Sequence, residues 1–276
     1  MRQPNVTTSA SLVSKVRRLE RWLGLCGLDP RRAFATARAL PAYLRDFAEL
    51  GRQAKAEKTP LPFGPMYPCL QDRIGESGTI SGHYFYQDLV VARRLFEARP
   101  RKHVDVGSRI DGFVAHLAVF REVEVFDVRT ISHPVPNVVF TQADLMGPLD
   151  ESLANYCDSL SCLHALEHFG LGRYGDPITY DGHLRGLGNL LHILQSGGKL
   201  YLSVPIGPQR IEFNAHRVFS VAYLITLFAE RCTIDRFSYV NDRGQLFEDV
   251  ALSEDSVQSN CGCVYGCGIF ELTKCR

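Results

Sequence analysis

The chain has 276 residues, of which 45% are hydrophobic and 22% charged, so its composition excludes a disordered chain and predicts one large α/β domain with a smaller appendage. Nine cysteines are too few for a disulfide scaffold at this length, no secretory signal opens the sequence, and the longest apolar runs are too short to cross a bilayer. We therefore predict a cytoplasmic protein.

The charge is distributed unevenly along the chain. Residues 1–58 hold twelve Lys or Arg against five Asp or Glu, a charge of +7, whereas the remainder carries −6. Leu12, Val16, Leu19 and Leu23 recur at helical spacing among basic residues. We predict a helical basic extension over residues 1–58 that packs on the main domain and leaves its basic face in solvent. Peripheral contact with anionic lipid, or with an acidic partner, is the alternative interpretation.

Helix breakers mark the next boundaries. Pro30 and Pro41 predict that the extension is divided into short helices, and a Pro/Gly-rich stretch over residues 59–80 predicts a surface connector. A main domain over residues 81–276 follows. It begins with a predicted helix in "SGHYFYQDLVVARRLFEAR", in which Phe85, Leu89 and Phe96 share one face.

From residue 103 onward, short apolar runs alternate with helical patterns, which is typical of a parallel sheet with helices on its faces. The runs are "HVDVG", "VEVFDV", "NVVFTQ", "CDSLSCL" and "KLYLSVP". One helix is expected from about Asp111, and another in "YDGHLRGLGNLLHIL". The last two runs, "CTIDRFSYV" and "CGIFELTK", lack an obvious helix between them and predict an antiparallel pair. The fold class is therefore α/β: a Rossmann-like, seven-stranded, mostly parallel sheet with an antiparallel last strand.

The stretch "HVDVGSRIDGF" predicts a ligand site at the carboxyl ends of the strands. Gly107 would let the backbone approach a ligand, and Gly112 would let the next helix pack closely and offer its N–H groups. Asp127, at the end of the second strand, is placed to accept hydrogen bonds from ribose hydroxyls. Asp144 follows the third strand, where a carboxylate can accept from an adenine amino group.

An NAD site would also contain a glycine turn, a helix and an acid at these distances. However, "GSRIDG" lacks the middle glycine of G-x-G-x-x-G, and no Tyr-x-x-x-Lys motif is recognisable. An NAD(P)-dependent oxidoreductase is thus the alternative of another class, and a non-catalytic scaffold with the same fold is a third.

Together with the helix, Gly-Gly pair and strand of "LLHILQSGGKLYLSVP", these motifs resemble the class I S-adenosylmethionine-dependent methyltransferases from about residue 80 to the end. The resemblance implies S-adenosyl-L-methionine as cofactor and methyl transfer as the reaction. The predicted cofactor-binding residues are Asp105, Gly107, Ser108, Gly112, Asp127, Val128, Asp144, Leu145, Leu163 and His164.

A narrower resemblance rests on "SGHYFYQDLVVA", "DVGSRIDGFVAHL", "LHALEHFGLGRYGD", "VPIGPQRIEFNAHRVFS" and "YGCGIFELTK". These motifs are similar to those of an uncharacterised methyltransferase-like family, first catalogued in nematodes and common in bacteria, where its members tend to lie among surface-polysaccharide genes. This resemblance implies O-methylation of a sugar or glycan hydroxyl in polysaccharide biosynthesis, with no nucleic-acid partner. A lipid-linked precursor is the alternative acceptor.

Methyl transfer to a hydroxyl requires a base within hydrogen-bond reach of that hydroxyl. We predict that His168 is the base, because Glu167 and His164 stand beside it in sequence and a nearby carboxylate can orient an imidazole. His216 completes the predicted catalytic set. The alternative for His164 and His168 is a histidine at a helix start that is held by a backbone carbonyl. The alternative for the stretch around His216 is a loop that packs the start of the next helix, with Asn and Ser as caps. The predicted acceptor-binding residues are Tyr84, Tyr86, Asn214 and Arg217.

The cysteine-rich stretch "CGCVYGC" does not predict a metal site. Its spacings differ from the paired arrangement of zinc knuckles, and Cys267 falls in a predicted strand, where a cysteine behaves as a small apolar residue. We therefore predict no metal ligand.

Overall fold

The computed structural model describes residues 22–56, 61–70, 72, 78, 80 and 82–276. The chain divides into two compact units, Met1–Thr79 and Ile80–Arg276. The helical pattern through Leu12, Val16 and Leu19 lies outside the described residues.

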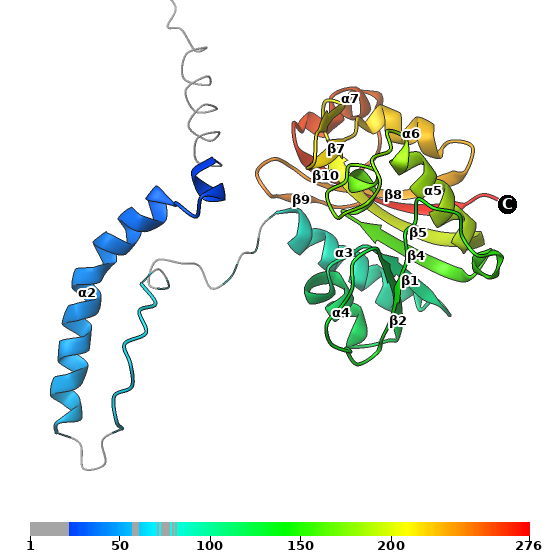
Figure 1. Cartoon of the computed structure of the whole chain (residues 1–276). Helices are drawn as coiled ribbons and strands as arrows, with labels where there is room; N and C mark the ends of the chain where they lie inside the picture. The colour runs from blue at the N-terminus through cyan, green and yellow to red at the C-terminus, as the bar shows by residue number, and fades with distance from the viewer. Residues whose placement is uncertain (1–21, 57–60, 71, 73–77, 79, 81) are drawn as a thin grey trace, which may run out of the picture. The chain divides into compact units, whose positions relative to one another are not determined.

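The first unit contains helix α2 (Pro30–Ala54), whose start is fixed by local chemistry (Figure 1). Asp29 accepts a hydrogen bond from the Arg32 N–H at 3.0 Å, and Pro30 occupies the first turn, where its missing N–H is not required. The prediction that Pro41 divides the helix is wrong. Pro41 removes one internal hydrogen bond, but the surrounding Ala, Leu and Arg residues favour a helix strongly enough for it to continue. Among the described residues, no helix is both long and apolar enough to cross a membrane.

The second unit is built on one eight-stranded sheet in the order β3-β2-β1-β4-β5-β10-β8-β9 (Figure 1). Its strands are β1 (His103–Val106), β2 (Val123–Asp127), β3 (Val138–Gln142), β4 (Cys157–Leu163), β5 (Leu194–Ile206), β8 (Cys232–Val240), β9 (Leu246–Phe247) and β10 (Gly266–Lys274). Strands β1 to β5 are parallel, and β10 lies antiparallel between β5 and β8. The predicted Rossmann-like sheet is confirmed, and the additional strand is the two-residue β9.

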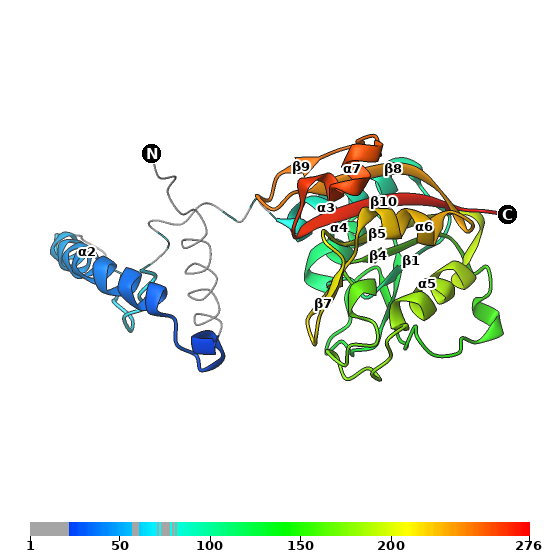
Figure 2. The ribbon, with the colours of Figure 1, turned by 90° about the horizontal axis from the view of Figure 1, so that it is seen from above.

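Helices cover both faces of the sheet (Figures 1 and 2). On one face lie α3 (His83–Ala98), the π-helical turn η1 (Ile110–Val114) and α4 (Ala115–Ala118). On the other face lie α5 (Gly182–Ile193) and α6 (Val221–Phe228). Each face has its own apolar core, because Leu95 and Phe113 belong to one buried cluster, whereas Leu187 and Leu224 belong to another. Strands that are buried on both faces in this way are typical of parallel sheets.

Several short elements extend beyond the carboxyl ends of the parallel strands. The 3-10 turn η3 (Leu166–His168) follows β4, and the hairpin of β6 (Arg210–Glu212) and β7 (His216–Val218) follows β5. A bridge between Ile206 and Phe219 joins this hairpin to the main sheet. The remaining short helices are η2 (Glu151–Leu153), α7 (Glu254–Gln258) and η4 (Asn260–Gly262). The sheet therefore gathers residues from η3 and the hairpin near the ends of β1 to β4.

Candidate active site

A pocket lies where β1, β2, β3 and β4 end. The predicted residues that line it are Gly107, Asp127, Val128, Asp144, Leu145 and His164, and Phe126 and Met146 add apolar surface. These residues meet because the carboxyl ends of parallel strands share one edge of a sheet. The lining combines carboxylates with apolar side chains, which suits a ligand that has both hydroxyls and a flat apolar ring.

Gly107 lines this pocket, whereas the predicted cofactor-binding residue Gly112 does not. Gly107 has a φ of +75°, and a Cβ added there would lie 2.8 Å from the Cβ of Ala165. A side chain at Gly107 is therefore excluded both by its left-handed backbone and by its neighbour. A Cβ at Gly112 would lie 2.9 Å from Asp88 Oδ2, so this glycine permits the close approach of η1 to α3.

The carboxylate of Asp127 is held by an arginine that the sequence analysis did not identify. Arg129 donates to Asp127 Oδ1 from its backbone N–H at 2.8 Å and from Nε at 2.9 Å, and to Oδ2 from Nη2 at 2.5 Å. The guanidinium also lies 4.8 Å from the ring centre of Tyr174. A ligand that binds Asp127 must therefore share the carboxylate with Arg129 or displace it. The one signal in the sequence for this ion pair is that Arg129 follows Asp127 by two residues.

Asp105, Ser108 and Leu163 support the pocket without lining it. Asp105 is fully buried and accepts hydrogen bonds from the N–H and Oγ of Ser108 and from Ser161 Oγ. Burial raises the pKa of Asp105 to about 7. These bonds hold the turn after β1 in place, whereas Leu163 packs in the core. Asp105, Ser108 and Leu163, which the sequence predicts as cofactor contacts, thus lie beside the pocket and support its walls.

The loop after η3 closes one side of the pocket with residues that the sequence analysis did not single out. Asp176 accepts from the N–H groups of Gly170, Gly172 and Tyr174 at 2.9–3.2 Å. This carboxylate fixes the loop so that Tyr174 and Asp176 itself line the pocket. The motif "LGRYGD" contains them, but nothing in its spacing indicates that the aspartate organises its own loop.

A second, polar pocket adjoins the first. Its lining includes Tyr84, Glu167, Arg173, Asn214, His216 and Tyr265, and His164 and His168 line both pockets. His164 has a φ of +51°, an uncommon conformation for a residue with a side chain and one that is found preferentially at functional sites. The structure thus brings together the predicted residues His164, Glu167, His168, His216, Asn214 and Tyr84.

Glu167 lies at the centre of these histidines with only 1% of its surface exposed. Its Oε1 lies 2.6 Å from His164 Nδ1 and 3.7 Å from His168 Nε2. Burial opposes ionisation of Glu167, but His164 and His168 outweigh it and lower its pKa below the ordinary value. Burial also opposes the charged form of His164, but Cys267 and Glu167 outweigh it and raise the pKa of His164 well above its usual value.

The geometry of His168 fixes which of its nitrogens is available. Nδ1 lies 2.6 Å from the carbonyl oxygen of Ala215, so the proton of the neutral ring is on Nδ1. Nε2 then carries a lone pair. Burial lowers the pKa of His168 below its usual value, more than Glu167 raises it, so the ring is neutral at pH 7. His168 can therefore accept a proton at Nε2.

The β6–β7 hairpin presents Asn214 and His216 to the polar pocket. Asn214 has a φ of +60°, which suits the turn of a hairpin and which asparagine tolerates better than most residues. His216 Nε2 lies 3.3 Å from Glu212 Oε2 on the opposite strand. Ser220, which follows this hairpin, has a capping role instead. It caps α6 by accepting a hydrogen bond from the Tyr223 N–H.

Two predicted acceptor-binding residues do not line either pocket. Arg217 is 3% exposed, and its guanidinium donates to the backbone carbonyls of Glu167, Phe169, Thr179 and Tyr180 at 2.6–3.4 Å. Tyr86 packs against Phe85 and the core of its face. These placements correct the prediction. Side chains alternate along β7, so Arg217 points away from the side to which His216 contributes.

Arg217→Met should therefore lower the stability of the fold. The change leaves buried carbonyls without donors, and we expect the free energy of unfolding to fall by about 3 kcal/mol. Arg185→Met, at an exposed arginine of α5, is the control and should change it by less than about 0.5 kcal/mol. Urea denaturation measures both. A fully stable Arg217→Met variant would contradict this structural role of Arg217.

Solved structures of similar overall arrangement share little sequence with this chain. One is a 1,6-didemethyltoxoflavin N1-methyltransferase of Burkholderia thailandensis with bound S-adenosylhomocysteine, at 15% identity and a TM-score of 0.49, covering 72% of this chain and 80% of that one. Another is an O-methyltransferase of a trans-AT polyketide synthase of Brevibacillus brevis, also with S-adenosylhomocysteine, at 15% identity and a TM-score of 0.48, covering 69% and 71%. No curated protein matches the chain.

One family model matches the sequence over residues 149–263, and its description is "Caenorhabditis protein of unknown function, DUF268". The match extends from the segment before β4 to the end of η4, before β10, and includes η3 and the β6–β7 hairpin. It confirms the resemblance to a family first catalogued in nematodes. The chain is thus similar to this uncharacterised family over η3 and the β6–β7 hairpin, which contribute most of the residues of the polar pocket, and its strand order is that of a Rossmann-like sheet.

Proposed function

We propose that this protein is an S-adenosylmethionine-dependent O-methyltransferase that acts on a hydroxyl of a sugar or glycan. One observation carries the proposal: His164 and His168 line both the pocket at the strand ends and the polar pocket beside it. A cofactor in the first pocket and an acceptor in the second would meet at these residues. A base at this junction can take the proton of the acceptor.

The residues of the first pocket fit S-adenosylmethionine. Asp127 offers a carboxylate to the ribose hydroxyls, Asp144 can accept from the adenine amino group, and Val128, Leu145 and Met146 provide apolar contacts for the ring. The space at Gly107, which a Cβ would fill, admits a ligand close to the backbone. When bound, the cofactor would supply a methyl group from its sulfonium.

The residues of the second pocket would bind the acceptor and remove its proton. His168 Nε2 accepts the hydroxyl proton while His168 Nδ1 stays bonded to the Ala215 carbonyl. Asn214 and Arg173 offer hydrogen bonds, and Tyr84 and Tyr265 offer flat faces with hydroxyl groups. This density of hydrogen-bonding groups supports a polyhydroxylated acceptor. The resemblance to a family that lies among surface-polysaccharide genes supports a glycan, which is why we favour it over other small acceptors.

The test compares S-adenosylhomocysteine with NAD⁺ as ligands of the full chain. We expect S-adenosylhomocysteine at a hundred times its Kd to stabilise the protein by about 2.7 kcal/mol. That stabilisation raises the Tm by several degrees, and thermal denaturation detects it. NAD⁺ at the same concentration should leave the Tm unchanged.

Stabilisation by NAD⁺ and not by S-adenosylhomocysteine would instead favour the oxidoreductase alternative. If neither ligand stabilises the protein, the scaffold alternative is favoured. Once S-adenosylhomocysteine binding is shown, incubation with S-adenosylmethionine and a panel of free sugars and sugar nucleotides identifies the acceptor by its gain of one methyl group in mass spectrometry.

A further inference from the structure

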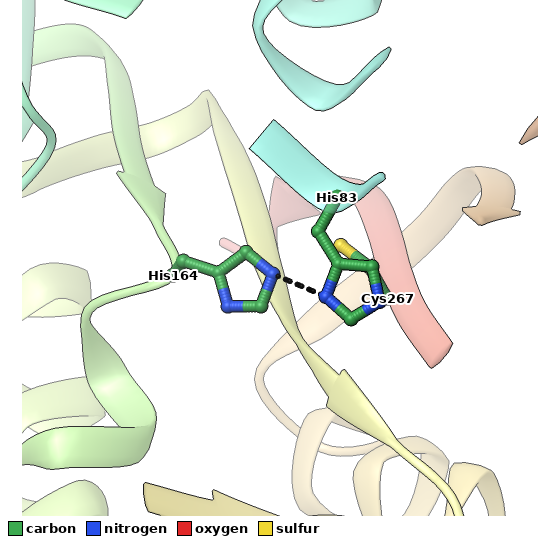
Figure 3. A group of neighbouring side chains, drawn as sticks. All are labelled: His83, His164 and Cys267. Carbon is green, nitrogen blue, oxygen red and sulfur yellow. Dashed lines mark hydrogen bonds between the residues drawn. The ribbon is translucent and has the colours of Figure 1, made fainter. Parts of the chain in front are cut away.

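We propose that His83, His164 and Cys267 form a binding site for one zinc-like divalent metal ion. The three side chains come from separate elements, since His83 begins α3, His164 follows β4 and Cys267 lies in β10 (Figure 3). Their ligand atoms all lie within 4.8 Å of one another. Two imidazoles and one thiolate are ligands that zinc prefers, and three protein ligands are typical of zinc sites with one open position.

The spacing of the ligand atoms fits tetrahedral coordination. His83 Nδ1 lies 3.1 Å from His164 Nε2. Zinc–nitrogen and zinc–sulfur bonds of about 2.0–2.3 Å place neighbouring ligand atoms about 3.3–3.6 Å apart in a tetrahedron. The two nitrogens therefore need to move by only a few tenths of an ångström. The sulfur needs to approach by no more than about 1.5 Å, which a change of side-chain torsion supplies.

Glu167 is placed to orient one of the ligands. Its Oε1 accepts the Nδ1 proton of His164 at 2.6 Å. The other ring nitrogen, Nε2, faces His83 and becomes a ligand when a metal ion displaces its proton. A carboxylate behind a histidine ligand is a recurrent feature of zinc sites. The other oxygen, Oε2, is buried and has no hydrogen-bond partner among the described residues, so part of the Glu167 charge lacks compensation. A cation bound to the opposite nitrogen of the His164 ring would compensate this charge.

The surroundings of Cys267 also favour a metal. Cys267 is fully buried, and the oxygens of Gln87 and Gly268 lie at 3.9 Å from its Sγ. Both contacts are long, weak hydrogen bonds for a thiol. The side chain of Cys267 also hydrogen-bonds that of His164, so the thiol already lies against the imidazoles of the cluster. Cys267 is set apart from the other buried cysteines by these two histidines.

The ion would lie beside the proposed acceptor pocket, because His164 lines that pocket. Its open position could bind an acceptor hydroxyl and favour loss of the hydroxyl proton to His168, in the way that zinc lowers the pKa of bound water. This role rests on the proposed function, whereas metal binding itself does not. The experiment therefore measures the metal alone, without cofactor or acceptor.

The test is titration of the full chain with Co²⁺ after treatment with a chelator and its removal. We expect one equivalent to bind and to produce visible absorption of tetrahedral Co²⁺, together with a near-ultraviolet band from thiolate-to-metal charge transfer. Addition of Zn²⁺ should abolish both bands by competition. Cys267→Ser should remove the charge-transfer band, and His83→Ala should weaken binding at least tenfold. Glu167→Gln should weaken it about 10–100-fold, as expected for a partner of a ligand.

Matched controls separate loss of a ligand from damage to the fold. Cys232→Ser removes a buried thiol of β8, and His183→Ala removes a buried imidazole of α5, and neither residue belongs to the cluster. Both controls should keep the full Co²⁺ spectrum. Circular dichroism verifies the fold of every variant. The proposal is overturned if the wild-type protein binds no stoichiometric Co²⁺ or Zn²⁺, or if folded Cys267→Ser and His83→Ala variants bind as the wild type does. Neither result bears on cofactor binding, which the ligand comparison above tests separately.

Discussion

Replacing His168 with alanine is expected to lower turnover by about 10²–10⁴ and to leave the affinity for S-adenosylhomocysteine nearly unchanged. The reason is that the proposed base is the lone pair of His168 Nε2, whereas the proposed hydrogen-bonding contacts of the cofactor are Asp127 and Asp144. The fold should survive, because Arg173 Nη1 still donates to the Ala215 carbonyl at 3.1 Å. Radiolabelled methyl transfer and calorimetry measure the two effects.

His168→Asn is the matched control for this experiment. Its amide can still donate to the Ala215 carbonyl but cannot act as a base, so it should be as slow as the alanine variant. His216→Ala should act mainly on the apparent affinity for the acceptor. If His216→Ala abolishes turnover at saturating acceptor while His168→Ala has little effect, the roles of the two histidines are reversed.

The same assignment sets the expected pH dependence. Burial lowers the pKa of His168, and Arg173 and His164 lower it further, whereas Glu167 and the Ala215 carbonyl raise it. The rings of Tyr174 and His216 also face His168. A base must be neutral to act, so turnover should rise with pH through a value below 6.5 and should not change further near pH 7. A rise centred above pH 7 would contradict His168 as the base.

Asp127→Ala is expected to reduce the affinity for S-adenosylhomocysteine at least tenfold, because the ribose loses hydrogen bonds to a charged group that contribute about 1.5–3 kcal/mol each. Asp127 lies at the end of β2 with 8% of its surface exposed, so its carboxylate faces the pocket in a largely water-free position. Isothermal titration calorimetry of the folded variant measures the loss. Unchanged affinity would contradict the assignment of Asp127 to the ribose.

Arg129→Met provides the informative companion to Asp127→Ala. The wild-type guanidinium binds both carboxylate oxygens, so a ligand must compete with it. Without that competition, the affinity for S-adenosylhomocysteine should stay the same or increase. A loss of affinity equal to that of Asp127→Ala would instead show that Arg129 itself contacts the ligand.

Most of the sheet and several residues of the pocket at its strand ends can be predicted from the sequence alone. The strands are short apolar runs with helical patterns between them, so local periodicity predicts where they lie along the chain. The antiparallel pair of β8 and β10 is also predicted, although the connection between them contains the short helix α7, which the sequence pattern does not reveal. Gly107, Asp127 and Asp144 directly follow or close strands. Their meeting at one sheet edge is a consequence of parallel packing that needs no knowledge of side-chain contacts.

The direction and partners of the individual polar side chains could not be predicted from the sequence. Arg217 points to backbone carbonyls, and Arg129 pairs with Asp127, because the backbone and the surrounding packing select each rotamer. The spacing of Cys267 from the cysteines near it in sequence predicts no metal site. The fold instead places Cys267 beside His83 and His164, which lie far away along the chain. Such a cluster has no signature in sequence, because its spacing is set by which strands become neighbours in the sheet and by where the first helix begins.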